Sequence, residues 1–255
     1  MPLWTVFDLD NTLILNAPAA ATPSSPNEEA DLILTPYAET ERVLQFLASR
    51  GVIITMASFR TNAEQVLREH GLRDYFAAIE YTQDRNRDRR SKSEMINELA
   101  EQLNLSIYDA VFFDDLEENV EECNNDLIHT IRVDERKGVT MELLFDALLN
   151  ALRPPFYVMS QRPLPREGLV NYLGEYRVTF LNCGVSAQQA FQITRVQPNA
   201  TVMIVPAPNT IELFHGGNQV RVTYPDLYEC LDAAVNELQG MEIDIPDTVG
   251  ELVRR

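Results

Sequence analysis

A short apolar run near the start of the chain, residues 3–7, ends in three polar side chains at even spacing, Asp8, Asp10 and Thr12. An apolar run of this length fits a buried β-strand. Side chains two positions apart in a strand point to the same face. Asp8 and Asp10 would then share one crevice at the carboxyl end of the strand, which is where open α/β sheets bind ligands.

Two carboxylates in one crevice can divide catalytic work. One can act as a nucleophile or metal ligand, and the other as a general acid and base. The Asp-x-Asp spacing alone is not specific, because pairs of acidic residues are common on the surface of acidic proteins. A strand end followed by an Asn-containing turn would give the same pattern, so the interpretation depends on the later strands.

Two of the later strands also end in polar side chains. The β-branched run 52–57 leads into Ser58, and the aromatic run 110–113 leads into Asp114 and Asp115. A hydroxyl at such a place is suited to an anion, and carboxylates are oxygen ligands of the kind that Mg²⁺ prefers. The structural alternatives are a plain loop hydroxyl at Ser58 and a helix N-cap at Asp114 or Asp115.

Lys92 is one of only two lysines in the chain. Ser91 and Glu94 have the spacing of a capping box, which places Lys92 in the first turn of a helix. A cation there opposes the helix dipole, so the lysine is either a tolerated surface residue or has a role such as holding a phosphate group.

Strands and helices alternate through the first part of the chain, which predicts a parallel sheet with helices on both faces. Residues 16–36 are rich in Ala, Pro, Ser and acids, and we expect a loop that is either a small lid or a surface insertion. The expected elements are strands at 3–7, 52–57, 78–82, 110–113 and 128–133, and helices at 37–50, 61–70, 91–104 and 139–152.

Pro154-Pro155 marks a boundary, which gives an expected first domain at 1–153 and a second at 154–255. The second domain is predicted to be a small α+β domain without a catalytic constellation. Its expected elements are strands at 172–181 and 201–205, a hairpin over 211–224 that turns at Gly-Gly, and a helix at 226–239.

The net charge of −18 over 255 residues disfavours a general nucleic-acid-binding role. Cys123, Cys183 and Cys230 are odd in number and far apart, so we expect buried free thiols in a reducing compartment. No signal peptide pattern and no membrane-spanning run is evident, which predicts an intracellular, cytoplasmic protein.

The ordered set of strand-end residues resembles the haloacid dehalogenase (HAD) superfamily of phosphatases. Within it, residues 1–152 are most similar to the magnesium-dependent phosphatase-1 type. The resembling pieces are Phe-Asp-Leu-Asp-Asn-Thr-Leu, Ala-Ser-Phe-Arg-Thr after the second strand, Ser-Lys at a helix start, and Phe-Phe-Asp-Asp-x-x-x-Asn. The resemblance implies a HAD-like Rossmannoid sheet, and it does not extend to the second domain.

The resemblance also implies residue roles. Asp8 would attack phosphorus and form an aspartyl-phosphate, while Asp10 would protonate the leaving oxygen and then activate water. The remaining implied roles are phosphate binding by Thr12, Ser58 and Lys92, and Mg²⁺ binding by Asp8, the Asp10 carbonyl and Asp114. Phosphoryl transfer needs this combination of positioning and charge neutralisation.

Two departures from the magnesium-dependent phosphatase-1 type bear on the substrate. Phe59 separates Ser58 from Arg60, so no phosphate role is assigned to Arg60. Acidic residues at 117–118 stand where basic ones are expected, so the substrate preference differs.

The expected function is Mg²⁺-dependent hydrolysis of a phosphomonoester at an open or small-capped site. The substrate would be a phosphoprotein, a nucleic-acid end or a small molecule. One alternative is a non-catalytic phosphate-binding or scaffolding protein, with the second domain mediating oligomer or partner contacts. Another is a related transfer, such as that of a phosphomutase; metal-dependent glycosyl transfer would not explain Ser58 and Lys92.

Overall fold

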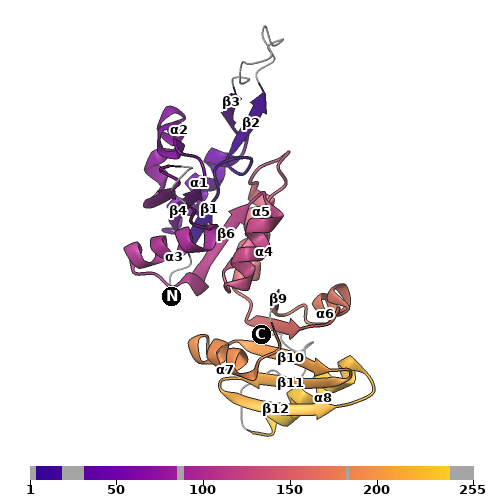
Figure 1. Cartoon of the computed structure of the whole chain (residues 1–255). Coiled ribbons are helices and arrows are strands. Elements are labelled where there is room, and N and C mark those ends of the chain that lie inside the picture. The colour runs from indigo at the N-terminus through magenta and orange to yellow at the C-terminus, as the bar shows by residue number, and fades with distance from the viewer. Residues whose placement is uncertain (1–3, 19–31, 85–88, 182–183, 242–255) are drawn as a thin grey trace. The chain divides into compact units, whose positions relative to one another are not determined.

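The structure is a computed structural model that describes residues 4–18, 32–84, 89–181 and 184–241 (Figure 1). It consists of two compact units, Met1–Leu149 and Asn150–Arg255. The boundary expected from the sequence, at Pro154, lies a few residues later, and the independent folding of the two domains stays a prediction.

The first unit contains a five-stranded parallel sheet in the order β5-β4-β1-β6-β7. All four residues of β1 are buried, because this strand lies at the centre between β4 and β6. The strands are β1 (Trp4–Phe7), β4 (Ile53–Ser58), β5 (Ala78–Tyr81), β6 (Ala110–Asp114) and β7 (His129–Arg132).

Helices flank this sheet. Residues of α3 and α4 pack on the face that carries Trp4, Val6 and Phe112. The side chains of Phe7 and Phe113 point to the opposite face of the sheet, and their rings stack with centroids 4.8 Å apart. The helices are α1 (Thr40–Ser49), α2 (Ala63–Glu69), α3 (Lys92–Leu103), α4 (Glu117–Asn125) and α5 (Met141–Ala151), with short 3₁₀ turns η1 (Arg73–Tyr75) and η2 (Ile107–Asp109). The predicted α/β class is confirmed.

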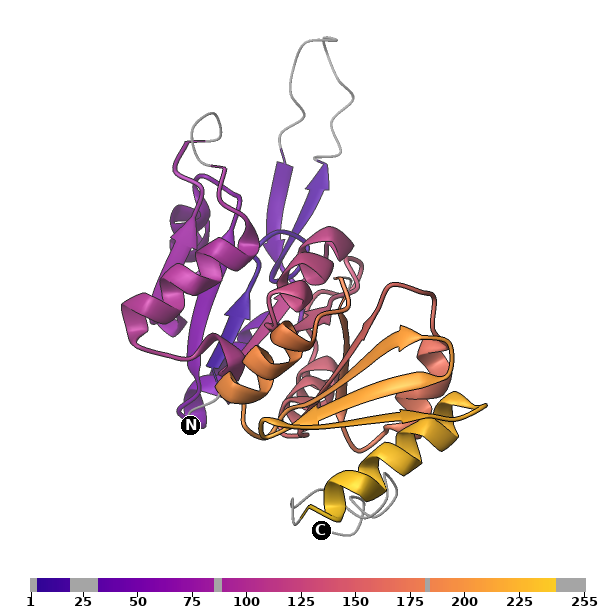
Figure 2. The ribbon, with the colours of Figure 1, turned by 60° about the horizontal axis from the view of Figure 1, so that its bottom comes forward.

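The segment expected to be a loop, 16–36, begins and ends in strands. β2 (Ile14–Pro18) and β3 (Leu32–Pro36) pair as an antiparallel hairpin, so the loop prediction is wrong at both ends. The prolines stand at the strand ends, where the missing N–H is tolerated. Both views show the hairpin extending away from the five-stranded sheet (Figures 1 and 2). Residues 19–31 lie outside the described part of the chain.

Two capping boxes were predicted, and one forms. Ser91 accepts from the backbone of Glu94, whose side chain accepts in return from Ser91 N, at the start of α3. The box predicted from Thr61 is wrong, because α2 begins after Asn62 and no side chain caps it. Ala63 N instead donates to Arg60 O in a turn that displaces the helix start.

The second unit contains a mixed sheet in the order β12-β11-β10-β8-β9. Strands β10, β8 and β9 run parallel, and β10, β11 and β12 are antiparallel. The strands are β8 (Pro155–Ser160), β9 (Arg177–Leu181), β10 (Thr201–Ala207), β11 (Thr210–His215) and β12 (Asn218–Thr223). The helices are α6 (Arg166–Tyr172), α7 (Ala187–Val196) and α8 (Leu227–Gln239).

The predictions for this unit are partly right. The hairpin is confirmed, with positive φ at Gly216 and Gly217, and so is the last helix. The strand predicted at 172–181 is wrong in its first half, because Tyr172 ends α6 and the strand begins only at Arg177.

No helix in the described ranges is long and apolar enough to cross a membrane. Cys123 and Cys230 are buried free thiols, as expected, and Cys183 lies outside the described residues.

A glycine substitution provides a test of the packing of the first unit. Gly138 has a φ of +64°, and a Cβ there would lie 2.2 Å from Cδ2 of Tyr37. Gly51 has a φ of +70° and nothing within 4 Å of its Cβ position. We expect Gly51→Ala to lower the free energy of unfolding by about 1 kcal/mol through backbone strain. Gly138→Ala adds overpacking and should cost about 3 kcal/mol in total.

Urea unfolding followed by the fluorescence of Trp4 measures both changes. Trp4 is the single tryptophan and is fully buried in β1, so it reports on the first unit. Equal destabilisation by the two substitutions would contradict the close contact between Gly138 and Tyr37.

Candidate active site

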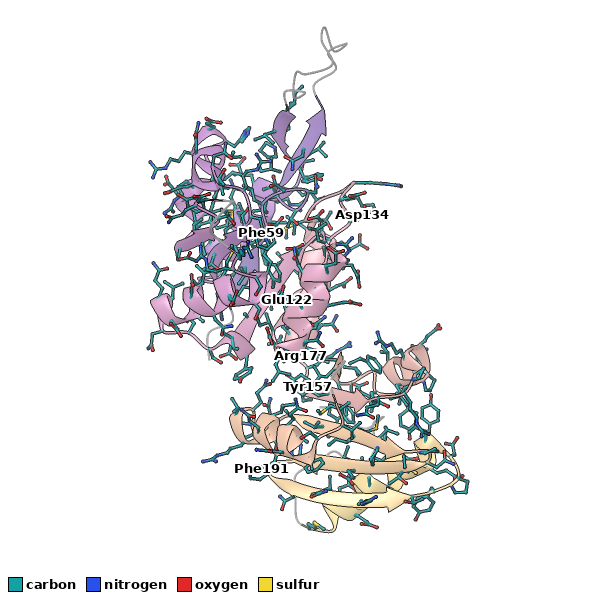
Figure 3. The ribbon with its side chains drawn as sticks, in the orientation of Figure 1. Phe59, Glu122, Asp134, Tyr157, Arg177 and Phe191 are labelled. Carbon is teal, nitrogen blue, oxygen red and sulfur yellow. The ribbon has the colours of Figure 1, made fainter. Side chains whose placement is uncertain are left out.

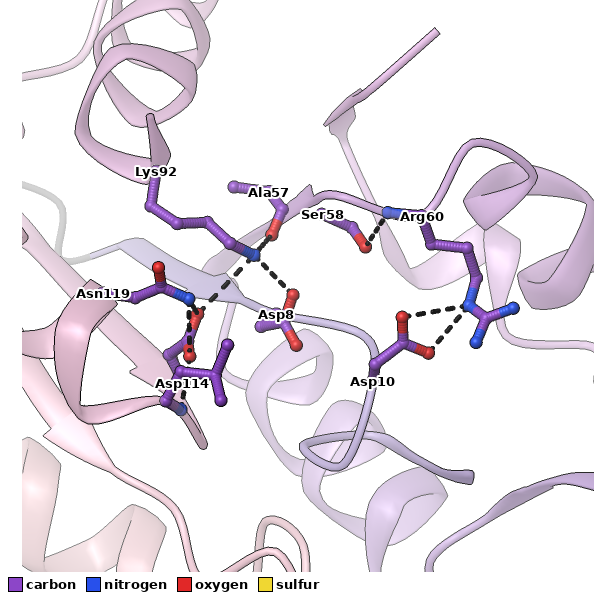
Figure 4. A network of polar contacts seen from close by, with 9 residues as sticks. Asp8, Asp10, Ala57, Ser58, Arg60, Lys92, Asp114 and Asn119 are labelled. Atoms are coloured by element: carbon purple, nitrogen blue, oxygen red, sulfur yellow. Dashed lines mark hydrogen bonds and ion pairs between the residues drawn. The ribbon is translucent and has the colours of Figure 1, made fainter. Parts of the chain in front are cut away.

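The carboxyl ends of three neighbouring strands, β1, β4 and β6, bring predicted site residues together (Figure 4). Asp8 follows β1, Ser58 ends β4 and Asp114 ends β6, while Lys92 is the first residue of α3. All four residues are buried, and the most exposed of them, Asp8, is 6% exposed. The parity of the strands places Asp8 and Asp114 on the sheet face that α3 covers.

Lys92 connects these strand ends. Its Nζ donates to Asp8 Oδ1 at 2.5 Å and to the Ala57 carbonyl at 2.6 Å, and it lies 3.5 Å from Asp114 Oδ2. The ring centroid of Phe59 lies 4.7 Å from Nζ, within range of a cation–π contact. Two carboxylates therefore offset the unfavourable position of this cation in the first turn of α3.

The charges in this cluster do not balance. Burial raises the pKa of Asp8; Lys92 lowers it and Asp114 raises it again, which leaves a pKa of about 7. Burial alone would lower the pKa of Lys92, but the two carboxylates raise it above its usual value. One cation thus lies between two carboxylates, and a negative charge remains in excess.

Asp114 is already well supplied with hydrogen-bond donors. Its Oδ1 accepts from Leu116 N at 2.7 Å and from Asn119 Nδ2 at 3.0 Å, and its Oδ2 accepts from the same Asn119 nitrogen at 2.9 Å. The pKa of the neighbouring Asp115 is raised by burial and by Asp114, and lowered by a hydrogen bond from the Asn11 side chain. Asp115 lies against the loop that follows β1 and is 4% exposed.

Asp10 pairs with a residue to which the sequence assigned no role. Arg60 Nε donates to both carboxylate oxygens of Asp10, at 2.7 and 3.0 Å (Figure 4). Arg60 Nη2 donates to Asn16 Oδ1 at 3.0 Å. The backbone N–H of Arg60 also donates to Ser58 Oγ at 3.2 Å. The only feature of the sequence that pointed to a role for Arg60 was its position two residues after Ser58, the hydroxyl at the end of a strand.

Thr12 lies on the same loop and is fully buried. Its Oγ1 has no hydrogen-bond partner within the described residues, while its carbonyl accepts from Val139 N at 2.9 Å. A phosphate-binding role for its hydroxyl stays a prediction.

The carboxylate oxygens at this site are ligands of the kind that Mg²⁺ prefers. Mg²⁺ takes oxygen ligands, keeps several waters and binds proteins through one or two carboxylates. Within the part of the chain that the structure describes, no three His, Cys, Asp or Glu side chains form a complete metal cage. Asp8 and the Asp114–Asp115 pair nevertheless supply the oxygens, and their excess negative charge favours a bound cation.

A family model described as haloacid dehalogenase-like hydrolase matches residues 25–124. The first unit is similar to haloacid dehalogenase-like hydrolases. The matched range contains Ser58, Lys92 and Asp114 and begins after Asp8 and Asp10. The parallel sheet of the first unit, with its flanking helices, has the HAD-like Rossmannoid fold. None of the curated proteins compared with the chain matches it.

Solved structures with similarity to the chain include a predicted phosphatase from Clostridium acetobutylicum, at 25% identity and a TM-score of 0.38. That match covers 45% of this chain and 53% of the other, so the chain spans about half its length. A HAD-superfamily hydrolase from Ehrlichia chaffeensis matches at 13% identity and a TM-score of 0.43, over 58% of this chain and 95% of the other. A haloacid dehalogenase-like family protein from Streptococcus pneumoniae matches at 14% identity and a TM-score of 0.40, over 57% and 90%.

The charge excess predicts a pH-dependent stability. Between about pH 4 and about pH 7, unfolded Asp8 is ionised whereas folded Asp8 keeps its proton. The free energy of unfolding of the first unit, in buffer with a chelator, should therefore fall as pH rises through this window. Asp8→Asn should remove this Asp8 contribution, about 4 kcal/mol, and saturating Mg²⁺ should reduce it.

Urea unfolding followed by Trp4 fluorescence at several pH values tests this expectation. Asp126→Asn, at the exposed C-cap of α4, is the matched control and should keep the wild-type pH dependence. A pH profile that is the same in wild type and Asp8→Asn would show that Asp8 titrates normally.

Proposed function

We propose that the chain is a Mg²⁺-dependent phosphatase that hydrolyses a phosphomonoester through an aspartyl-phosphate at Asp8. The observation that carries this proposal is the buried Asp8 carboxylate at a strand end, bonded to Lys92 and flanked by Ser58 and Asp114. The similarity of the first unit to haloacid dehalogenase-like hydrolases supports hydrolysis as the reaction class.

The proposed chemistry has two steps. A carboxylate oxygen of ionised Asp8 attacks phosphorus, and the bond from phosphorus to the ester oxygen breaks while Asp10 gives that oxygen a proton. Water then attacks phosphorus of the acyl phosphate, Asp10 takes the proton from the water, and Asp8 is released. Lys92 and the Ser58 hydroxyl donate to the phosphoryl oxygens during both steps.

The cation would be held by Asp8, the main-chain carbonyl of Asp10 and one carboxylate after β6. When bound, it neutralises negative charge and favours the ionised form of Asp8. Asp115 is the better candidate for the second carboxylate than Asp114, because the oxygens of Asp114 already accept three hydrogen bonds from Leu116 and Asn119. Asp114 would then position Lys92.

Arg60 would control the state of Asp10 in this scheme. In the structure Arg60 Nε donates to both carboxylate oxygens of Asp10, so both oxygens are engaged. Asp10 can donate a proton in the first step only after Arg60 has moved away from these oxygens.

The substrate class follows from the surroundings of the site. The described part of the insertion after β1 is the β2–β3 hairpin, which favours a small cap and an open site. Phe59 is 39% exposed beside Lys92 and offers an apolar contact to a leaving group. The proposed substrates are a phosphoprotein, a nucleic-acid end or a small phosphate ester. We also propose that the second unit mediates oligomer or partner contacts and that the protein is cytoplasmic.

Phosphate release from an aryl phosphate tests the proposal. We expect turnover with Mg²⁺, loss of turnover with a chelator, and a decrease of at least about a thousandfold in kcat for Asp8→Asn. Asp126→Asn should retain wild-type activity, because Asp126 is exposed at the C-cap of α4. Turnover in Asp8→Asn equal to wild type would exclude Asp8 as the nucleophile.

The ion pair of Asp10 with Arg60 favours a second candidate, a non-catalytic phosphate-binding module, because it occupies the proposed acid. Phosphopeptides, phosphorylated nucleic-acid ends and small phosphate esters separate the two functions. A module would bind one of them without hydrolysing it, whereas a selective phosphatase would release phosphate from at least one.

Arg60 can be tested as a positioning residue. Arg60→Gln removes the bonds to Asp10 and to Asn16, so kcat should fall about tenfold while KM stays within a factor of about two. Arg60→Lys should recover part of kcat. Arg68→Gln, which removes an exposed arginine of α2, serves as control. A rise in KM with unchanged kcat would instead place Arg60 on the substrate.

A further inference from the structure

The second unit has a cavity of its own at the carboxyl ends of β8 and β9. It encloses about 370 Å³, in the size range of sites for small organic molecules. Its walls come from β8, from the segment that joins β8 to α6, and from the end of β9. The residues that matter here are Val158, Arg162, Leu164, Arg166 and Phe180.

The side-chain parity of β8 shows which helix covers which face. Phe156 and Val158 share a core with Leu169 of α6, with Leu173 at the C-cap of α6 and with residues of α8. Tyr157, labelled in Figure 3, points to the other face, where its hydroxyl bonds the side chain of Gln197 at the end of α7. Helices α6 and α7 therefore lie on opposite faces of this sheet.

The cavity lies at the carboxyl ends of the adjacent parallel strands β8 and β9, whereas the strand order reverses between β8 and β10. From β8 the chain passes through α6 to β9 on one side, and from β9 it returns through α7, on the other face, to β10 on the far side of β8. The segments that follow the adjacent strands β8 and β9 thus leave on opposite faces. In open α/β sheets, ligands bind outside the carboxyl ends of the strands, and the cavity lies at that edge of the sheet.

The charged side chains that line the cavity are two exposed arginines, and Ser160 and Gln161 add uncharged polar groups. Neither Arg162 nor Arg166 has a carboxylate partner among the residues that the structure describes, whereas Arg221 in the same unit lies 3.3 Å from Glu212. The guanidinium carbon of Arg166 lies 5.1 Å from the ring centroid of Phe180, which orients this side chain along the cavity wall. Ser160 Oγ accepts from Arg162 N at 3.1 Å and fixes the turn after β8.

We propose that this cavity binds a small organic phosphate. The forked N–H groups of Arg162 and Arg166 would bind the phosphate oxygens, because planar guanidinium groups match that geometry. Val158, Leu164 and Phe180 would contact the organic part of the ligand. The second unit then carries a ligand site that uses none of the residues of the candidate active site, and the proposal stands whether or not the first unit is a phosphatase.

Phosphonates are suitable probes because they resist hydrolysis. The experiment follows the arginine Nε–H resonances of the full chain by NMR during titration with methylphosphonate and with phenylphosphonate, at constant ionic strength. Arg162→Gln and Arg166→Gln assign the two resonances of the cavity, and Arg60→Gln assigns the one at the candidate active site. We expect saturable shifts at Arg162 and Arg166, with phenylphosphonate binding more tightly through Phe180.

The variants measure the contribution of each arginine. Arg162→Gln or Arg166→Gln should weaken binding at the cavity about tenfold, whereas Arg221→Gln should leave it unchanged. Shifts at Arg60 alone would overturn this proposal and support phosphate binding by the first unit. Shifts at Arg162 and Arg166 alone would support it while weakening the proposed phosphatase. No saturable response of these two to either probe would also overturn it.

Discussion

The buried ammonium of Lys92 is the constraint on which the first unit depends. Only 1% of this side chain is exposed, and an unpaired buried charge would cost several kcal/mol. Its partners are Asp8 after β1, the Ala57 carbonyl in β4 and Asp114 in β6. The register of three strands and the first residue of α3 must therefore all be correct for this one charge to be satisfied.

The same cluster is not optimised for stability. Asp8 and Asp114 face one lysine, and burial with residual repulsion raises the pKa of Asp8 to about 7. A sheet that needed only stability could place apolar residues at these strand ends, as Phe7 and Phe113 show one position earlier. Buried carboxylates with a raised pKa cluster at functional sites, where stability is given up for function.

Local patterns explain which features could be predicted from the sequence. The capping box at Ser91 involves residues three apart, so its sequence signature was sufficient. The alternation of apolar runs and amphipathic segments likewise predicted the parallel sheet and the residues at its strand ends. The box at Thr61 failed because a competing turn at Arg60 has no comparable signature.

Tertiary pairing accounts for what the sequence could not show. Arg60 and Asp10 are 50 residues apart, and nothing in either local sequence indicates that they meet. In the second unit, β8 follows Pro154 directly and pairs with β9 and β10 in parallel, so no hairpin turn marks its partners. The cavity with Arg162 and Arg166 depends on that parallel pairing, so it could not be predicted from the sequence either.

The overall charge limits the kind of ligand that either unit can accept. At −18, the chain repels an extended polyanion along its whole length, and local cations would have to offset many phosphates. A small phosphate ester carries its charge within a few ångström, where Lys92, or Arg162 with Arg166, can neutralise it directly. Among the proposed ligands, charge therefore favours small phosphate esters over nucleic-acid ends for both units.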